Sequence, residues 1–246
     1  MTHCGIDGYS RMVVYLKCSD NNRASTVYSL FLKGAECYGL PSRVRCDQGG
    51  ENVLVAQHMI HHRGVDQRSV IVGSSVHNQR VERLWRDMHR CVTLLFYRLF
   101  YFLENQGMLD PVNERDLYAL HFTFLPRINQ ALSKFQDGWN RHGIRTEHNM
   151  TPYQLFTYGA LQLQHTGLVA LDFFETTSEE YGIDDSDPIL AESSIDEGVS
   201  IPQVNIHLET EQLEQLQDEV NPLQQSDNYG IDIYLKAIEV LNRFLI

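Results

Sequence analysis

The chain has 246 residues, 43% of them hydrophobic, which is enough for one large domain or for one domain with extensions. Its net charge of −12 is uneven: residues 1–168 hold 18 Lys and Arg against 14 Asp and Glu, whereas residues 169–246 hold 2 against 18. The overall acidity therefore does not exclude a nucleic-acid partner for the first two thirds. No apolar run approaches the roughly 18 residues of a membrane span, so none is predicted. Five cysteines without a CxxC pair indicate reduced, mostly buried intracellular thiols.

The first elements alternate between strands and a helix. A short apolar run ends at Asp7, and turn residues follow it. Because only six residues precede Asp7, we expect this strand to be truncated. Residues 11–18 alternate in polarity, which predicts an antiparallel partner strand, and residues 23–38 predict an amphipathic helix. Another short apolar run ends at Asp47, next to a glycine pair.

The middle of the chain predicts a short helix from Glu51 to Met59 and a buried strand over residues 69–73. His58, His61 and His62 lie close together in this region. They suggest a metal site, but no Cys or further His accompanies them at ligand spacing, so a solvated surface is favoured.

A long helix is predicted from residue 78 to about residue 104. In its first turns Glu82 lies between an apolar face and a stripe formed by Arg83, Arg86 and Arg90. An ordinary Glu82–Arg86 ion pair on an amphipathic helix is the alternative interpretation.

Three motifs together resemble the acidic triad of the retroviral-type integrase core domain. They are Ile-Asp-Gly-Tyr-Ser-Arg around Asp7, Arg-Cys-Asp-Gln-Gly-Gly-Glu-Asn around Asp47, and His-Asn-Gln-Arg-Val-Glu-Arg around Glu82. Thirty-four residues separate Asp47 from Glu82, which is close to the spacing in this family. The resemblance covers roughly residues 1–160 and suggests a gene derived from a retroelement or transposon.

The resemblance implies an α/β fold of the RNase H-like type, a mixed sheet flanked by helices. It implies that Asp7, Asp47 and Glu82 are catalytic and hold two Mg²⁺ or Mn²⁺ ions, with Asp7 bridging both. Phosphates of DNA would be bound by basic and polar side chains of the same region, namely Arg11, Asn78, Arg80, Arg83 and Arg86. A homo-oligomer and an intracellular, nuclear location are also expected.

The rest of the chain predicts two more helices and then an acidic extension. Residues 113–140 have a helical pattern that Pro126 is expected to kink or split, and Thr151-Pro152 is a typical helix start. We expect residues 1–160 to form the integrase-like domain, residues 161–228 an acidic, partly disordered linker, and residues 229–246 a short amphipathic helix.

The implied activity is 3′-end processing and strand transfer of DNA by two-metal phosphoryl transfer. An alternative is a catalytically silent, host-retained module that binds nucleic acid or protein. A nuclease acting on an RNA–DNA hybrid is a third possibility, disfavoured by the wording of the motifs and by the spacing before Glu82.

Overall fold

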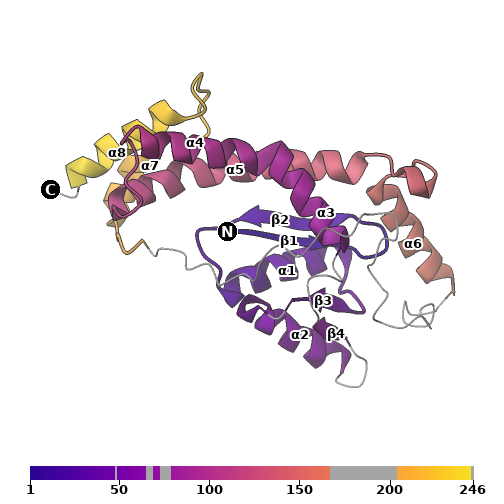
Figure 1. The fold of residues 1–246 in the computed structure, drawn as a ribbon. Helices are drawn as coiled ribbons and strands as arrows, with labels where there is room; N and C mark the ends of the chain where they lie inside the picture. Colours follow the sequence, from indigo (N-terminus) through magenta and orange to yellow (C-terminus); the bar gives the residue numbers. More distant parts are fainter. Residues whose placement is uncertain (48, 65–68, 73–78, 167–203, 245–246) are drawn as a thin grey trace. The chain divides into compact units, whose positions relative to one another are not determined.

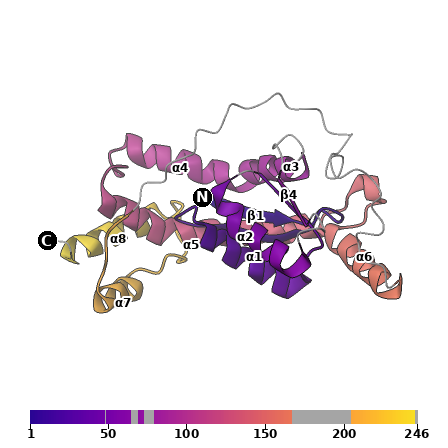
Figure 2. The same ribbon diagram turned by 90° about the horizontal axis from the view of Figure 1, so that it is seen from below.

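The structure is a computed structural model, and it describes residues 1–47, 49–64, 69–72, 79–166 and 204–244. These residues form two compact units, shown in Figures 1 and 2: Met1–Asp87 with Phe135–Val199, and Met88–Lys134 with Ser200–Ile246. We call them unit 1 and unit 2. The predicted domain boundaries at residues 160 and 228 stay predictions.

Unit 1 contains all four described strands. Strands β1 (Thr2–Ile6) and β2 (Val13–Cys18) pair antiparallel, whereas β3 (Val44–Cys46) and β4 (Val70–Val72) pair in parallel. An α/β fold is therefore confirmed. Within the described residues, however, the strands form two separate two-stranded sheets, so the expectation of one mixed sheet is not met there. The three-residue length of β3 and β4 explains this in part, because so short a pair offers few backbone groups for a further strand.

The helices of unit 1 bury apolar side chains beside these strands. Helix α1 (Ala24–Tyr38) and helix α2 (Val53–Arg63) supply a buried cluster made of Val27, Phe31, Val55 and Met59. Tyr15 of β2 also packs against this cluster, and the strand pairing places Gly5 of β1 directly opposite Tyr15. A Cβ atom at position 5 would lie 2.4 Å from the Tyr15 ring, so this position requires glycine.

Side-chain amides at the C-terminal end of helix α5 (Glu114–Arg141) form hydrogen bonds with the backbone of β2. The Asn140 amide accepts a hydrogen bond from the Val13 N–H at 2.9 Å and donates one to the Val13 carbonyl at 3.0 Å. Gln136 donates a second bond to the same carbonyl at 3.0 Å. These amides therefore take the place of a neighbouring strand at Val13.

Helix α6 (Pro152–Thr166) begins where the Thr151-Pro152 pair predicts. The Thr151 hydroxyl accepts a hydrogen bond from the Gln154 N–H at 3.1 Å, and the Gln154 side chain accepts one from the Thr151 N–H at 2.9 Å. This reciprocal pair is a capping box, which satisfies two backbone donors at the helix start.

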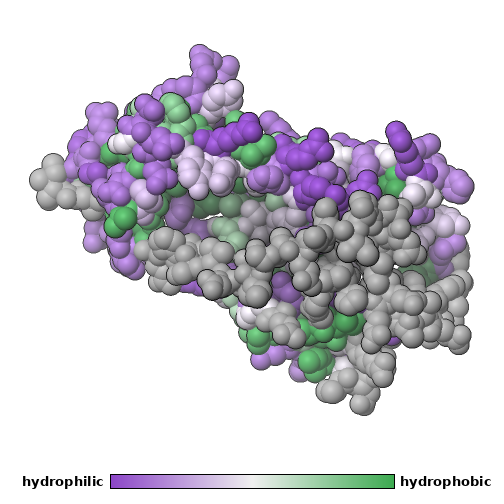
Figure 3. All heavy atoms as spheres, viewed as in Figure 1, coloured by the Kyte–Doolittle hydropathy of each residue, from purple (hydrophilic) through white to green (hydrophobic). Residues whose placement is uncertain are grey.

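Unit 2 is helical. Helix α3 (Gln79–Met88) belongs to unit 1 except for its last residue, and a π-helical turn follows it at His89–Thr93. Unit 2 also contains α4 (Leu94–Asn105), most of α5, α7 (Thr210–Glu219) and α8 (Ile231–Phe244). Aromatic rings fill its core, where Phe124 lies 5.1 Å from Phe100 and 6.0 Å from Tyr234, measured between ring centroids. On the face shown in Figure 3, hydrophilic residues predominate over these helices.

Two expectations are not met in full in this region. Pro126 does not split α5, which continues through it for 28 residues while Phe124 and Ile128 beside it are buried. Low order does not hold for Thr210–Glu219, because a Glu209–Gln212 capping box and the burial of Leu216 stabilise α7. The rest of the expected linker, residues 167–203, lies outside the described residues.

The C-terminal helix follows the prediction, and the cysteines follow it only in part. Helix α8 is amphipathic as predicted: it buries the face that contains Tyr234 and Leu241, whereas Leu235 is 42% exposed. The five cysteines are free thiols, but Cys37 and Cys91 are exposed and the other three are only partly buried. No described helix is long and apolar enough to cross a membrane.

Candidate active site

Asp7 follows β1 directly and is held by the turn after it. Its Oδ2 accepts hydrogen bonds from the Ser10 N–H at 2.7 Å and from the Ser10 hydroxyl at 2.6 Å. Ser10 is fully buried, and the Asp7 N–H donates to the Met12 carbonyl at 2.7 Å to close the turn. The carboxylate is thus fixed in one orientation at the end of the strand.

Asp47 follows β3 and is exposed. Its Oδ1 accepts a hydrogen bond from the Asn52 side-chain amide at 2.8 Å, and Asn52 closes the 3₁₀ turn Gly50–Asn52 that precedes α2. Because the residue is exposed, Asp47 is oriented by this one neighbour and remains accessible to a ligand through its second oxygen, Oδ2.

Glu82 lies in the first turn of α3, and its pKa is raised above the ordinary value of a glutamate. Partial burial of the carboxylate among protein atoms is the larger cause, and the negative charge of Asp47 is the second. The residue as a whole is still exposed, so this desolvation is incomplete. The effect of Asp47 shows that the two carboxylates share one electrostatic environment.

This raised pKa predicts how Glu82 affects stability as the pH changes. A carboxyl group whose pKa is higher in the folded than in the unfolded state contributes stability at low pH, and that contribution is lost as the pH rises through the folded pKa. Urea denaturation over a pH series should therefore show Glu82→Gln gaining stability relative to the natural chain as the pH rises. Glu36→Gln, at an exposed position on α1, is the control and should show no such gain.

The three predicted acids occupy comparable positions in unit 1. Asp7 and Asp47 follow the ends of β1 and β3, and Glu82 lies at the start of α3; Figure 1 shows these three ends on the same side of the unit. Asp47 and Glu82 are brought together electrostatically. Asp7 is turned toward Ser10, and among the described residues no three His, Cys, Asp or Glu side chains are grouped closely enough to hold a metal ion.

The predicted DNA-binding arginines fall into two groups. Arg83 and Arg86 are exposed on α3, whereas Arg80 is partly buried with its Nε shielded from solvent. Arg11 is also mostly buried: its side chain is 16% exposed, and its guanidinium lies 3.8 Å from the Glu147 carboxylate. A phosphate would have to compete with Glu147 for Arg11. Asn78 lies outside the described residues.

Several residues that support the site were missed by sequence reasoning. They are Ser10 and Asn52, which orient two of the acids, and Trp139, whose indole N–H donates to the Arg11 carbonyl at 2.9 Å. Arg11 has a φ of 63°, a left-handed conformation that a non-glycine residue adopts at a cost and that this bond helps to hold. The Asp-x-x-Ser spacing was a detectable signal for Ser10, because a serine three residues after an aspartate is typical of such turns. No nearby sequence pattern indicates the contact of Trp139 with Arg11, because the two residues are 128 positions apart.

Ser10→Ala should destabilise the chain by about 1–3 kcal/mol, the usual result of leaving buried polar groups without a partner. The Ser10 hydroxyl donates to Asp7 and accepts from the Met12 N–H at 3.2 Å, so both bonds are lost together. Urea denaturation measures the change. Ser29→Ala, which removes an exposed hydroxyl bonded to the Thr26 carbonyl, is the control and should have little effect. Equal effects at the two positions would contradict the proposed role of Ser10.

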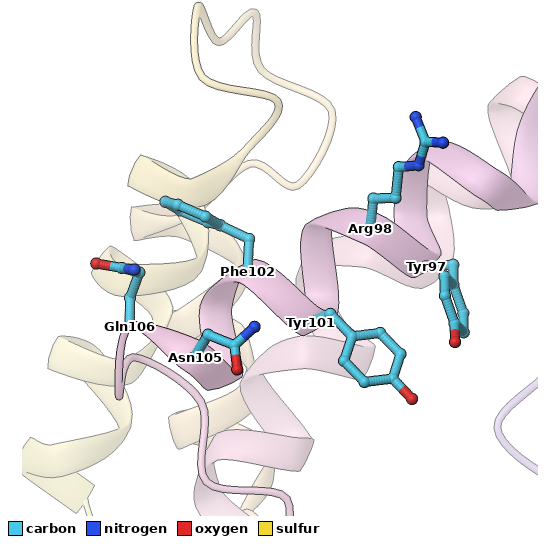
Figure 4. A pocket seen from close by; sticks show the side chains of 6 residues that line it. All are labelled: Tyr97, Arg98, Tyr101, Phe102, Asn105 and Gln106. Atoms are coloured by element: carbon cyan, nitrogen blue, oxygen red, sulfur yellow. The ribbon is translucent and has the colours of Figure 1, made fainter.

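A hollow of about 460 Å³ lies on the surface of α4 in unit 2, away in sequence from the acids. Figure 4 shows the side chains that surround it: Tyr97, Arg98, Tyr101, Phe102, Asn105 and Gln106. All of them come from α4 and the residue after it, and they point outward from one helix. The hollow gathers no group of acids, so we assign the chemistry to unit 1.

The chemistry of the donor set can be compared with the metal that the motifs imply. Three carboxylates are the hard oxygen ligands that Mg²⁺ and Mn²⁺ prefer. The raised pKa of Glu82 is due first to burial and second to the negative charge of Asp47, and a divalent cation would offset both effects. The donor types therefore fit such ions.

The motif acids thus follow two strand ends and lie at one helix start of an α/β unit. The sequence family model for the integrase core domain matches residues 1–170, more than half of the chain. The chain therefore belongs to the integrase core domain family, which implies an RNase H-like fold. No curated protein and no solved structure matches it.

Proposed function

We propose that this chain is a polynucleotidyl transferase that processes DNA 3′ ends and transfers them to a target strand. Asp47 and Glu82 are 35 positions apart in sequence, yet the charge of Asp47 contributes, after burial, to the raised pKa of Glu82, which supports a shared site for two of the three motif acids. Membership of the integrase core domain family supplies the reaction class.

In this proposal Asp7, Asp47 and Glu82 hold two Mg²⁺ or Mn²⁺ ions. Such ions, when bound, activate the attacking water or 3′-hydroxyl and stabilise the leaving 3′-oxygen in an in-line displacement. Ser10 keeps the Asp7 carboxylate in its orientation, and Asn52 does the same for Asp47. Both supports fix a ligand before the ions arrive.

DNA would bind along α3. Arg83 and Arg86 are exposed on the helix that carries Glu82, so a phosphate bound there lies beside the acidic site. Contacts of this kind weaken as salt rises, because binding releases counterions from the DNA. Arg80, Arg11 and Asn78 complete the proposed set, and the proposal includes assembly into a homo-oligomer and a nuclear location.

The direct experiment is to incubate the chain with a DNA duplex and Mn²⁺ or Mg²⁺ and to resolve nicked and joined products on a denaturing gel. The proposal predicts metal-dependent nicking and joining that fall as salt rises. An RNA–DNA hybrid run in parallel tests the nuclease alternative, which would favour the hybrid.

A second candidate is a catalytically silent module that binds nucleic acid or protein. It is favoured by the lack of a three-ligand metal cluster among the described residues. Salt-sensitive DNA binding without any metal-dependent product would support the module over the enzyme.

A further inference from the structure

Three histidines lie in the last turns of α2, at positions 58, 61 and 62. The rings of His58 and His62 are stacked, with their centroids 4.0 Å apart and their planes 26° apart, and the His61 ring packs edge-on against His62 at 5.1 Å. His58 and His62 are four residues apart, so they share one face of the helix. Two histidines at this spacing are a known way for one helix to bind a metal.

The hydrogen bonds of the two rings leave the same nitrogen open on each. The Nδ1 of His62 lies 2.9 Å from the His58 carbonyl, and since a carbonyl only accepts, this Nδ1 carries the hydrogen. The Nε2 of His62 therefore carries the lone pair. The Nδ1 of His58 is bonded to the Tyr28 hydroxyl at 3.0 Å, which leaves its Nε2 as the second possible ligand.

This pattern is the one that metal-binding histidines use. A ligating imidazole almost always bonds its other ring nitrogen to a carbonyl, carboxylate or water, which fixes its orientation. Here the His58 ring is fixed further by Tyr28 and by Phe31, whose ring centroids lie 5.6 Å and 5.8 Å away. One ligand is therefore held in place before any ion binds.

The distances and charges around the pair also suit a cation. Zinc–nitrogen bonds are about 2.0–2.1 Å long. The centroids of the two rings are 4.0 Å apart, so both imidazoles lie near enough to reach one ion after the His62 ring rotates. The nearby Arg63 guanidinium donates to the Leu40 carbonyl at 2.6 Å and the Pro41 carbonyl at 3.2 Å, so it is engaged on the neighbouring loop. His62 is exposed, which leaves room for water to complete the coordination.

We propose that His58 and His62 form a surface site for one divalent transition metal such as Zn²⁺, bound through both Nε2 atoms and completed by water. Because an imidazole lone pair lies in the plane of its ring, the exposed His62 ring must rotate out of the stack when the ion binds, so that both Nε2 atoms point at it. Imidazole nitrogens select Zn²⁺ over Mg²⁺, so the site is chemically separate from the carboxylates of Asp7, Asp47 and Glu82. It is independent of the proposed catalytic function.

The test is a calorimetric titration of the full chain with ZnCl₂ in buffer that contains excess MgCl₂, which occupies the carboxylates. His62→Gln should lower the affinity for Zn²⁺ at least tenfold. His61→Gln removes an exposed histidine one residue away, outside the proposed ligand pair, and should leave the affinity within twofold. Equal affinity in His62→Gln and the natural chain, or an equal loss in His61→Gln, would overturn the site.

X-ray absorption of the zinc-loaded natural chain gives a second result that depends on no variant. The proposal predicts two imidazole nitrogens per zinc at about 2.0–2.1 Å. A spectrum with only oxygen neighbours, or a natural chain that binds no zinc, would overturn it.

Discussion

Asp47→Asn should lower metal-dependent DNA nicking and joining by more than about 100-fold, since even residues that only support a metal ligand cost 10–100-fold. The amide has nearly the shape of the carboxylate but lacks the charge that holds a divalent ion. Gel assays of the natural and variant chains, in Mn²⁺ and in Mg²⁺, measure the loss. Asp47 is exposed, so folding should be little changed.

Asp20→Asn is the matched control for this substitution. Asp20 is exposed in the loop after β2, and the change of charge is the same. Activity should stay close to that of the natural chain. Products that persist in Asp47→Asn at the natural level would contradict the proposed catalytic role.

Phe124→Ala should destabilise the chain by about 3–5 kcal/mol, the usual cost of removing a large buried aromatic side chain. Phe124 is 1% exposed in the core of unit 2, where the rings of Phe96, Phe100 and Tyr234 surround it. The aromatic side chains around the resulting cavity lose their contacts with the Phe124 ring. Urea denaturation followed by circular dichroism measures the change in the free energy of unfolding.

Phe102→Ala is the control, because this phenylalanine lies on α4 of the same unit but is 47% exposed. Its removal should cost much less than that of Phe124. Similar losses at the two positions would mean that the packing of unit 2 differs from the one described.

The order of the elements could be predicted because each carries a local signal. Alternation over residues 11–18 indicated β2, helical periodicity with a stop at Gly39 indicated α1, and Thr151-Pro152 marked the start of α6. The motif acids were found by the same means, since Asp7 and Asp47 end apolar runs next to glycine. These signals act within a few residues and do not depend on the rest of the chain.

What the sequence could not provide depends on contacts between distant residues. The amphipathic helix at the C-terminus was predicted, but the burial of Tyr234, whose hydroxyl donates to the Met108 carbonyl at 3.1 Å, depends on packing within unit 2. The engagement of Arg11 by Glu147 and Trp139 likewise joins segments more than 100 residues apart. Continuation of α5 through Pro126 reflects burial on both sides of the proline, which outweighs its local preference.

The arrangement of the histidines of α2 also could not be predicted from the sequence, although these residues are close together in the chain. The spacing of the three histidines in the sequence favoured a solvated surface over a metal site, because no cysteine or further histidine lies at ligand spacing from them. The stacking of His58 on His62 and the bonds of their Nδ1 atoms appear only when Tyr28 and the helix backbone are in place. Orientation, more than ligand count, suggests the site.

Crystals of the chain soaked in MnCl₂, with the anomalous signal of manganese recorded, test the role of the three acids most directly. The account predicts two manganese ions about 3.5–4 Å apart, the spacing of two-metal sites, with oxygen ligands from Asp7, Asp47 and Glu82. Ions bound elsewhere, or manganese that is held by Asp47 and Glu82 without any bond to Asp7, would contradict it.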